Sequence, residues 1–301
     1  MNGLTDYITS GRWEEIFTIW YVSVDDAYQA LERRYGAWRR AGPKPTFSDS
    51  EVITIALICD TFFHGHEELC LCFVRSFWLN LFPNLLERSR FNRRRRQLAM
   101  MTEQIRQHLP GQLIREEDRD RLIDSAPIPA CTYGRASQCQ TAAGEEHFSV
   151  MPSRKAKLFG FRVQVLATFD QVIDRWMLAP AAPRDSKMAA AFLEDAAHLR
   201  IWGDNAYHDP TVQAWLKEVR NIELSGAQRR DAKEPWPEEV RALFGRARRL
   251  VETVLSVLCT VFNLEQVGAR SPDGRLARLA SRFLAYNLSF VVTRKLATLQ
   301  N

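Results

Sequence analysis

The sequence predicts an α/β fold, in which a mixed sheet with flanking helices follows an all-helical N-terminal region. In the first hundred residues, apolar positions recur at helical spacing behind helix-capping residues. From Asp120 onward, short β-rich runs alternate with helical segments, a pattern typical of a sheet with helices packed on it. We therefore expect two parts, residues 1–112 and 113–301.

Three helices are expected before residue 112. Ser48 followed by Glu51 is a capping-box pattern, and an apolar run follows it directly. Pro83 halts the second helix, and Ser89 is in position to cap the third. The helices are expected over 52–63, 67–81 and 90–109.

The second part begins with a strand and a hairpin and continues with alternating helices and strands. The hairpin is expected to turn at Asp170-Gln171, and Ser186 is expected to cap the first helix after it. Strands are expected over 121–128, 159–169, 172–178, 199–203 and 221–224, and helices over 186–198, 210–220, 237–264 and 276–299.

Positive charge is concentrated in one short segment. The chain has 301 residues, is 46% hydrophobic and carries a net charge of +5. Between Arg75 and Arg106 there are eight arginines and two acids, a local surplus of 8 − 2 = +6. Arginine concentrated in this way is typical of contacts with phosphate, so the Arg93–Arg96 run is expected to bind DNA. A solvated helix face is the alternative.

Targeting signals and a metal-binding cysteine pattern are missing from the sequence. No stretch approaches the roughly 18–20 apolar residues that span a bilayer, and Met1–Ser10 lacks the features of a signal peptide. The six cysteines show no repeated metal-type spacing. We expect reduced thiols in a cytoplasmic protein that does not enter a membrane.

Two aspartates interrupt apolar elements. Asp124 lies in the strand-like run 121–128, where aspartate is disfavoured, and Asp204 ends the run 199–203. Each can be a turn residue, Asp124 through an Asx-turn toward Pro127 and Asp204 through Asp-Asn turn chemistry. Each can also be a metal-binding carboxylate, because divalent ions that act on phosphodiesters prefer clustered oxygen ligands.

Glu252 lies on the helix expected over 237–264, on a stripe beside the apolar face. Arg248 and Arg249 share this stripe at intervals of four and three residues. One interpretation is a solvated face with local ion pairs, although arginine before glutamate is the weaker orientation for such a pair. The other is a carboxylate for metal with arginines for phosphate.

The chain resembles bacterial insertion-sequence transposases with an Asp-Asp-Glu triad, and most closely the insertion-sequence 982 group. The resemblance spans about residues 47–299 and rests on seven motifs in order. They are Ser48-Asp49-Ser50-Glu51-Val52-Ile53, Phe82-Pro83-Asn84-Leu85 with Ser89-Arg90-Phe91-Asn92-Arg93-Arg94, Asp124-Ser125-Ala126-Pro127-Ile128-Pro129, Phe159-Gly160-Phe161-Arg162-Val163, Asp185-Ser186-Lys187, Gly203-Asp204-Asn205-Ala206-Tyr207 and Arg249-Leu250-Val251-Glu252-Thr253-Val254.

The resemblance implies a ribonuclease-H-like catalytic domain at 113–301 and a basic DNA-binding region at 1–112. In that fold the first carboxylate lies on the first strand, the second just after the fourth strand and the glutamate on a later helix. Asp124, Asp204 and Glu252 are then the catalytic residues and the ligands of two Mg²⁺ or Mn²⁺ ions. Asp185 would support the metal site without belonging to the triad. The DNA contacts expected are Arg90, Arg93, Arg94, Arg95, Arg96, Tyr207, Arg248 and Arg249.

The implied activity is cleavage of a phosphodiester at the element ends, followed by attack of the freed 3′-hydroxyl on target DNA. The partners would be double-stranded element ends and target DNA, bound by a dimer in the bacterial cytoplasm at the nucleoid. A catalytically inactive DNA-binding remnant and a ribonuclease-H-like nuclease without strand transfer are the alternatives. The chain departs from the pattern at Asn205-Ala206, where Lys or Arg followed by Gly is usual, and at Cys259, where related transposases often carry Lys.

Overall fold

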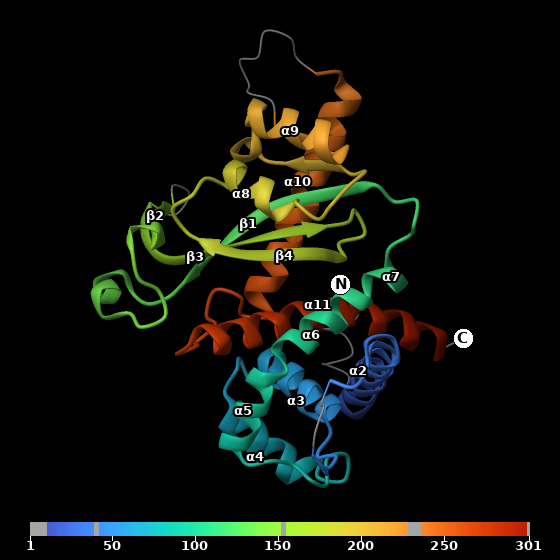
Figure 1. Cartoon of the computed structure of the whole chain (residues 1–301). Helices are drawn as coiled ribbons and strands as arrows, with labels where there is room; N and C mark the ends of the chain where they lie inside the picture. The colour runs from blue at the N-terminus through green and yellow to red at the C-terminus, as the bar shows by residue number, and fades with distance from the viewer. Residues whose placement is uncertain (1–10, 39–41, 152–154, 228–235, 300–301) are drawn as a thin grey trace. The chain divides into compact units, whose positions relative to one another are not determined.

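The computed structural model describes residues 11–38, 42–151, 155–227 and 236–299, and the chain divides into two compact units (Figure 1). The helical unit comprises residues 1–113 and 260–301, and the α/β unit comprises residues 114–259. No described helix is long and apolar enough to cross a membrane. No disulfide joins any of the six cysteines in the structure.

The helical unit contains the predicted N-terminal helices and the C-terminal helix of the chain. Its elements are α2 (Trp13–Tyr35), α3 (Asp49–Phe62), α4 (Glu67–Phe77), α5 (Arg88–Gln97), α6 (Ala99–His108), α7 (Pro110–Leu113) and α11 (Pro272–Leu299). The Ser48–Glu51 capping box is present at the start of α3. The helix predicted over 90–109 is divided at Leu98 into α5 and α6, and its N-cap is Glu87 rather than Ser89.

Helix α11 packs against α6, α3 and α2 (Figure 1). Ala280, Phe283, Leu284 and Leu288 are fully buried along it, which explains why this segment is apolar. Residues 260–301 therefore fold with the helical unit, and not with the α/β unit as had been expected from the sequence.

The described residues of the α/β unit form a six-stranded mixed sheet with helices on both faces. Its elements are β1 (Asp120–Pro129), η1 (Tyr133–Gln138), η2 (Glu145–His147), β2 (Phe148–Met151), β3 (Ala156–Ala167), β4 (Ile173–Pro180), α8 (Asp185–Phe192), β5 (Arg200–Gly203), η4 (Asn205–Tyr207), α9 (Pro210–Arg220), β6 (Glu223–Gly226) and α10 (Glu238–Thr260). Strand β1 pairs antiparallel with β3 and parallel with β5, and β5 pairs parallel with β6. Strands β2 and β4 both pair antiparallel with β3.

This sheet confirms the predicted ribonuclease-H-like fold class. Leaving out the short β2, the strand order is β4-β3-β1-β5-β6. Of these five strands, β3 alone runs antiparallel to the others. The hairpin turns at Asp170-Gln171 as expected, with Gln171 in the left-handed region at φ 66°. Strand β2 was not anticipated, and α8 ends at Phe192 rather than at His198.

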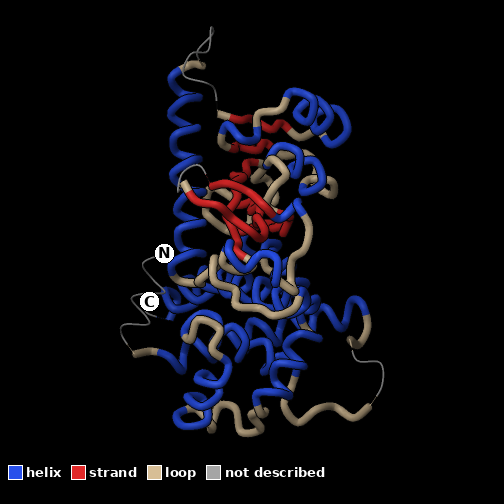
Figure 2. Tube along the Cα trace, turned by 90° about the vertical axis from the view of Figure 1, so that its left-hand side faces the viewer, coloured by secondary structure: helices blue, strands red, loops and turns tan. Residues whose placement is uncertain are grey.

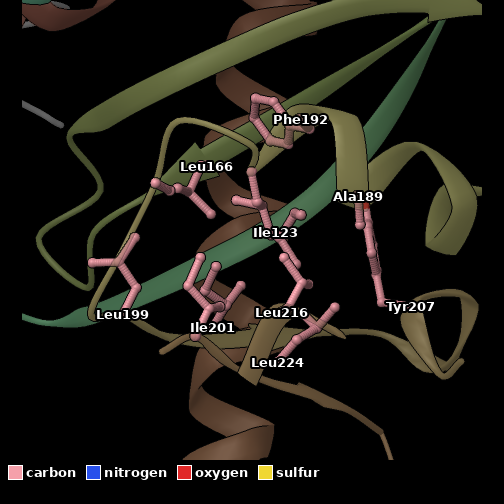
Figure 3. Close-up of a cluster of buried hydrophobic side chains, with 12 residues drawn as sticks. Ile123, Leu166, Ala189, Phe192, Leu199, Ile201, Tyr207, Leu216 and Leu224 are labelled. Carbon is pink, nitrogen blue, oxygen red and sulfur yellow. The ribbon is translucent and has the colours of Figure 1, made fainter. Parts of the chain in front are cut away.

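Side chains on alternate positions of the sheet build two separate cores, because neighbouring residues of a strand point to opposite faces. Ile123 packs with residues of α8 and α9 in the cluster drawn in Figure 3. Leu122, one position earlier, packs on the other face with Ala247 and Val251 of α10. Figure 2 shows the strands between α10 and the helices of the opposite face.

Candidate active site

The pairing of β1 with β5 sets the level of the two aspartates. The strands are parallel, and each residue of β1 pairs with the residue 80 positions later, Leu122 with Trp202 being the last pair. Asp124 and Asp204 are separated by the same 80 positions, so the register carried two residues further brings them level. Strand β5 ends at Gly203, so Asp204 is the first residue after the strand.

A glycine is required where the chain leaves β5. A Cβ atom at Gly203 would lie 2.8 Å from Ile123 Cγ2 and 2.8 Å from Tyr207 Cδ2. Because real Cβ atoms do not approach so closely, the close packing of β5 on β1 depends on the missing side chain. Gly203 thus helps to place Asp204 next to β1.

The alternation of β1 directs Asp124 toward α10. Asp124 is two positions after Leu122, which packs on Ala247 and Val251 of that helix, so both side chains leave the same face. Glu252 directly follows Val251 on α10. The three predicted triad residues therefore lie near one end of the sheet, on the face that α10 covers. Asp124 lies on β1, Asp204 directly after β5 and Glu252 on α10, as expected from the sequence.

Asp124 is the most strongly perturbed of the three. The pKa of its carboxyl is raised to about 7, mainly by burial and also by the charges of Asp204, Asp185 and Glu252. The backbone N–H of Ser125 opposes this by donating a hydrogen bond of 2.7 Å to Asp124 Oδ1. A carboxylate withdrawn from water among other carboxylates is costly unless a cation joins it.

Asp204 is exposed as a residue, but its carboxylate is partly withdrawn from water. Burial is the largest cause that raises the pKa of Asp204, and the charge of Asp185 raises this pKa as well. Asp204 Oδ1 accepts a hydrogen bond of 2.8 Å from the backbone N–H of Ala206 and so caps η4, while the charge of Arg248 lowers the pKa. The turn chemistry anticipated for Asp204 is present together with the electrostatic coupling.

Glu252 is exposed and bound by Arg248, whose Nε donates to Glu252 Oε1 at 2.8 Å. The pair raises the pKa of Arg248. Glu252 is close enough for its charge to act on Asp124. Among the described residues, however, no group of three or more His, Cys, Asp or Glu side chains is arranged to hold a metal ion. The donor chemistry fits a hard divalent cation, but the third carboxylate is engaged by an arginine.

A fourth carboxylate, Asp185 at the first turn of α8, belongs to the same cluster. It is buried, and Arg162 Nη1 donates to its Oδ2 at 2.9 Å. Gln164 Nε2 donates to the backbone carbonyl of Asp185 at 3.2 Å. Asp185 Oδ1 and Gln164 Oε1 are buried and accept no hydrogen bond from any described residue. A supporting position was expected for Asp185, but no role was expected for Arg162 or Gln164, because an arginine and a glutamine in a strand carry no distinguishing signal.

Comparison with protein-family models matches residues 115–288 to the model described as "Transposase DDE domain". The match covers more than half of the 301 residues. The chain belongs to the DDE transposase family. Its matched region runs from before β1 into α11 and contains all three predicted triad residues.

One solved structure among those matched is the Mos1 transposase paired-end complex with left transposon end. It is 12% identical to this chain, and the match covers 78% of this chain and 84% of the Mos1 chain with a TM-score of 0.22. No curated protein matches the chain significantly in sequence.

The structure corrects one DNA contact expected of this transposase near the triad. Tyr207 is completely buried in the cluster with Ile123 and Ala189 (Figure 3), and burial raises its pKa well above the ordinary range. Its hydroxyl has no hydrogen-bond partner among the described residues. Tyr207 therefore packs under Asp204 and does not reach DNA. Arg248, which binds Glu252, and its neighbour Arg249 are both exposed.

The run Arg93–Arg96 is divided between surface and interior. Arg95 is buried and forms ion pairs with Asp60 and Glu67. Arg94 binds Asp49 and the carbonyl of Phe47. Four consecutive residues cannot share one face of a helix that turns 100° per residue. Arg95 and Arg94 are thus structural, whereas Arg93, Arg96 and also Arg90 are exposed.

Proposed function

We propose that this DDE family member is an insertion-sequence transposase of the 982 group, which cleaves element ends and joins them to target DNA. The observation that carries the proposal is the level position of Asp124 and Asp204 on neighbouring strands, with the pKa of Asp124 raised to about 7 by burial and by neighbouring carboxylates. Perturbed carboxyls gathered at one strand end are typical of catalytic sites. The expected partner is duplex DNA, bound by a dimer.

Asp124, Asp204 and Glu252 would hold two Mg²⁺ or Mn²⁺ ions. When bound, such ions supply activation of the attacking oxygen and stabilisation of the leaving oxygen in phosphodiester chemistry. The fit rests on donor chemistry, since all three side chains offer oxygen, and on the raised pKa of Asp124, which burial and the neighbouring carboxylates cause. Arg162 would fix Asp185 behind them through the 2.9 Å hydrogen bond.

The pair between Arg248 and Glu252 is suited to exchange partners. Both side chains are more than half exposed, at 68% and 54%. Exposed pairs contribute only about 0–1 kcal/mol, so a DNA phosphate can take Arg248 and leave Glu252 free. Arg249, adjacent and exposed, would hold the same backbone. Binding of DNA and completion of the carboxylate triad would then occur together.

The test is incubation of the protein with Mn²⁺ and DNA that contains the ends of its own element. Cleavage with a joined product supports the proposal. Cleavage without joining indicates a nuclease, and binding alone indicates a DNA-binding remnant; either outcome contradicts it. The products are resolved on sequencing gels.

The site assignment is tested by Asp124→Asn, which should abolish cleavage and leave DNA binding intact. The matched control is Asp195→Asn, which makes the same chemical change at an exposed aspartate of the same unit. The control should cleave as the unmodified protein does. Persistent cleavage by Asp124→Asn would refute the assignment.

A further inference from the structure

The helical unit contains a groove of about 1510 Å³ that the proposed chemistry does not use. It is lined by the beginning of α4, one side of α5, the segment 263–271 and the first turns of α11. Four arginines line it, namely Arg88, Arg96, Arg270 and Arg278, against the two acids Glu67 and Glu68. All of these residues belong to the same compact unit.

The two acids do not cancel the arginines. Glu67 is buried and is already bound by Arg95, by Arg278 and by Asn92, whose Nδ2 donates at 2.9 Å. Among the described residues, Glu68 pairs only with Arg88, at 3.9 Å and between largely exposed side chains. Arg96 and Arg270 are exposed and form no ion pair with any other described residue. The groove therefore presents cations whose charge is not neutralised.

Helix α5 shows two distinct exposed faces. Residues four apart share a face, which places Arg88, Asn92 and Arg96 together along the groove. Arg90 and Arg93 are exposed on the other side of α5 and do not line the groove. Phe91 and Arg95 are buried and form the side of α5 that packs on the helical unit. The arginine-rich sequence thus serves one interior contact and two separate surfaces.

The positive end of α11 adds to the groove. Ser271 and Gly274 line it, and Ser271 Oγ accepts a hydrogen bond of 3.1 Å from the Gly274 N–H. A Cβ at Gly274 would lie 3.9 Å from Arg96 Cδ, so the Arg96 side chain lies at the first turn of α11. Helix N-termini favour anions, and here one coincides with an unpaired arginine.

We propose that this groove binds the phosphate backbone of duplex DNA through Arg88, Arg96 and Arg270. The cations are spread along the groove: Arg88 and Arg96 are eight residues apart, about 12 Å along α5 at a rise of 1.5 Å per residue. This separation is too large for one phosphate and fits successive phosphates of a polyanion. The identity of the polymer rests on the proposed function, whereas the location of the site rests on the groove itself.

The experiment compares two double variants of equal charge, Arg96→Gln with Arg270→Gln in the groove and Arg90→Gln with Arg93→Gln on the outer side of α5. Binding of a labelled duplex of arbitrary sequence is measured without divalent ions at several salt concentrations. The groove variant should bind more weakly and lose about 2 from the slope of log K against log salt, about 1 for each phosphate contact. Arg75→Gln, at an exposed arginine outside the groove, should leave both quantities unchanged.

Cys72 provides a second readout without any substitution, because it lines the groove and is exposed. Bound duplex should slow alkylation of Cys72 by a maleimide, while Cys131, in the α/β unit, serves as the internal reference. Sites of alkylation are resolved by peptide mass spectrometry. Inorganic phosphate at the same phosphate concentration should give no comparable protection.

Three results would overturn the proposal: equal losses in the two double variants, an unchanged salt slope in the groove variant, or alkylation of Cys72 at the same rate with and without duplex. Protection by inorganic phosphate alone would assign the groove to a small anion instead. None of these measurements involves cleavage. Failure of the groove is therefore distinguishable from failure of the transposase assignment, which the element-end reaction tests.

Discussion

The helical unit and the α/β unit treat their buried acids in opposite ways. In the helical unit, Asp60 and Glu67 are buried and face Arg95, and Arg278 binds Glu67 as well. In the α/β unit, Asp124 has no ion-pair partner among the described residues and is surrounded by other carboxylates. The first arrangement neutralises buried charge within the helical unit, and the second leaves the ionised form of Asp124 without an opposite charge paired to it among the described residues.

This difference separates acids that are neutralised within the fold from the acids that we propose to be catalytic. A buried acid with an arginine opposite it is neutralised and stabilises the packing only while both partners remain. A buried acid that faces like charges has its pKa raised and destabilises the ionised protein until a ligand joins it. The two classes should respond in opposite directions to substitution.

The largest effect is expected for Arg95→Met in the helical unit. Removing the guanidinium leaves Asp60 and Glu67 without their shared partner in a buried site, which should lower the free energy of unfolding by roughly 3–5 kcal/mol. Urea denaturation of the full chain measures this. Arg93→Met, at an exposed arginine two positions earlier, should stay within about 0.5 kcal/mol. A loss of less than about 1 kcal/mol for Arg95→Met would show that Arg95 is not needed to neutralise Asp60 and Glu67.

The next effect is a pH dependence of stability that originates at Asp124. Its pKa is about 7 in the folded chain, against an ordinary value of 3.8. Between these values the unfolded chain releases a proton that the folded chain retains. Stability is therefore fully present below about pH 4 and falls as pH rises to about 7, by up to about 4 kcal/mol. Around Asp124, the charges of Asp204, Asp185 and Glu252 raise its pKa, and Arg248 also interacts with it.

Urea denaturation in EDTA at pH 5 and pH 8 measures this slope. Asp124→Asn removes the ionisable group and should make the protein more stable at pH 8 and less dependent on pH. Asp195→Asn should keep the slope of the unmodified protein. An unchanged slope in Asp124→Asn would assign the pH dependence elsewhere and remove the contrast between the units.

A divalent cation should reverse the instability of the α/β unit. At pH 8, Mn²⁺ at about 100 times its dissociation constant should stabilise the fold by about 2.7 kcal/mol through binding to the native state. Asp204→Asn should lose most of this gain, whereas Asp195→Asn should retain it. The measurement is the shift of the thermal midpoint with Mn²⁺ concentration. A full shift in Asp204→Asn would place the ion elsewhere.

The sequence was most informative where local chemistry decides the structure. Helix α9 has the predicted limits, because Asp209 caps it ahead of Pro210 and Asn221 ends it in the left-handed region. Asp124 and Asp204 could be identified because they interrupt apolar runs, and their register then follows from the pairing of β1 with β5. The cation role of these residues and of Glu252 stays a prediction.

The sequence was less informative where tertiary packing decides which way a side chain points. Tyr207 and Arg95 were expected at the DNA, but both are buried. For Arg95 a signal existed, since Asp60 lies within an apolar helix and requires a partner. For α11 no such signal exists, because an apolar helix can pack on either unit and its sequence does not indicate which one.

The smallest effect is expected for Arg248→Gln, which removes the exposed arginine that binds Glu252. The pair with Glu252 is exposed, so its loss should change the free energy of unfolding by less than about 1 kcal/mol. The same substitution removes a positive charge near Asp124 and Asp204 and releases Glu252, so Mn²⁺ should bind more tightly in the absence of DNA. Titration calorimetry with Mn²⁺ measures this, with Arg241→Gln, an exposed arginine of the same helix, as the control. Weaker Mn²⁺ binding in Arg248→Gln would mean that the arginine positions Glu252 for the cation instead of competing with it, and the exchange of partners on DNA binding would then have to be abandoned.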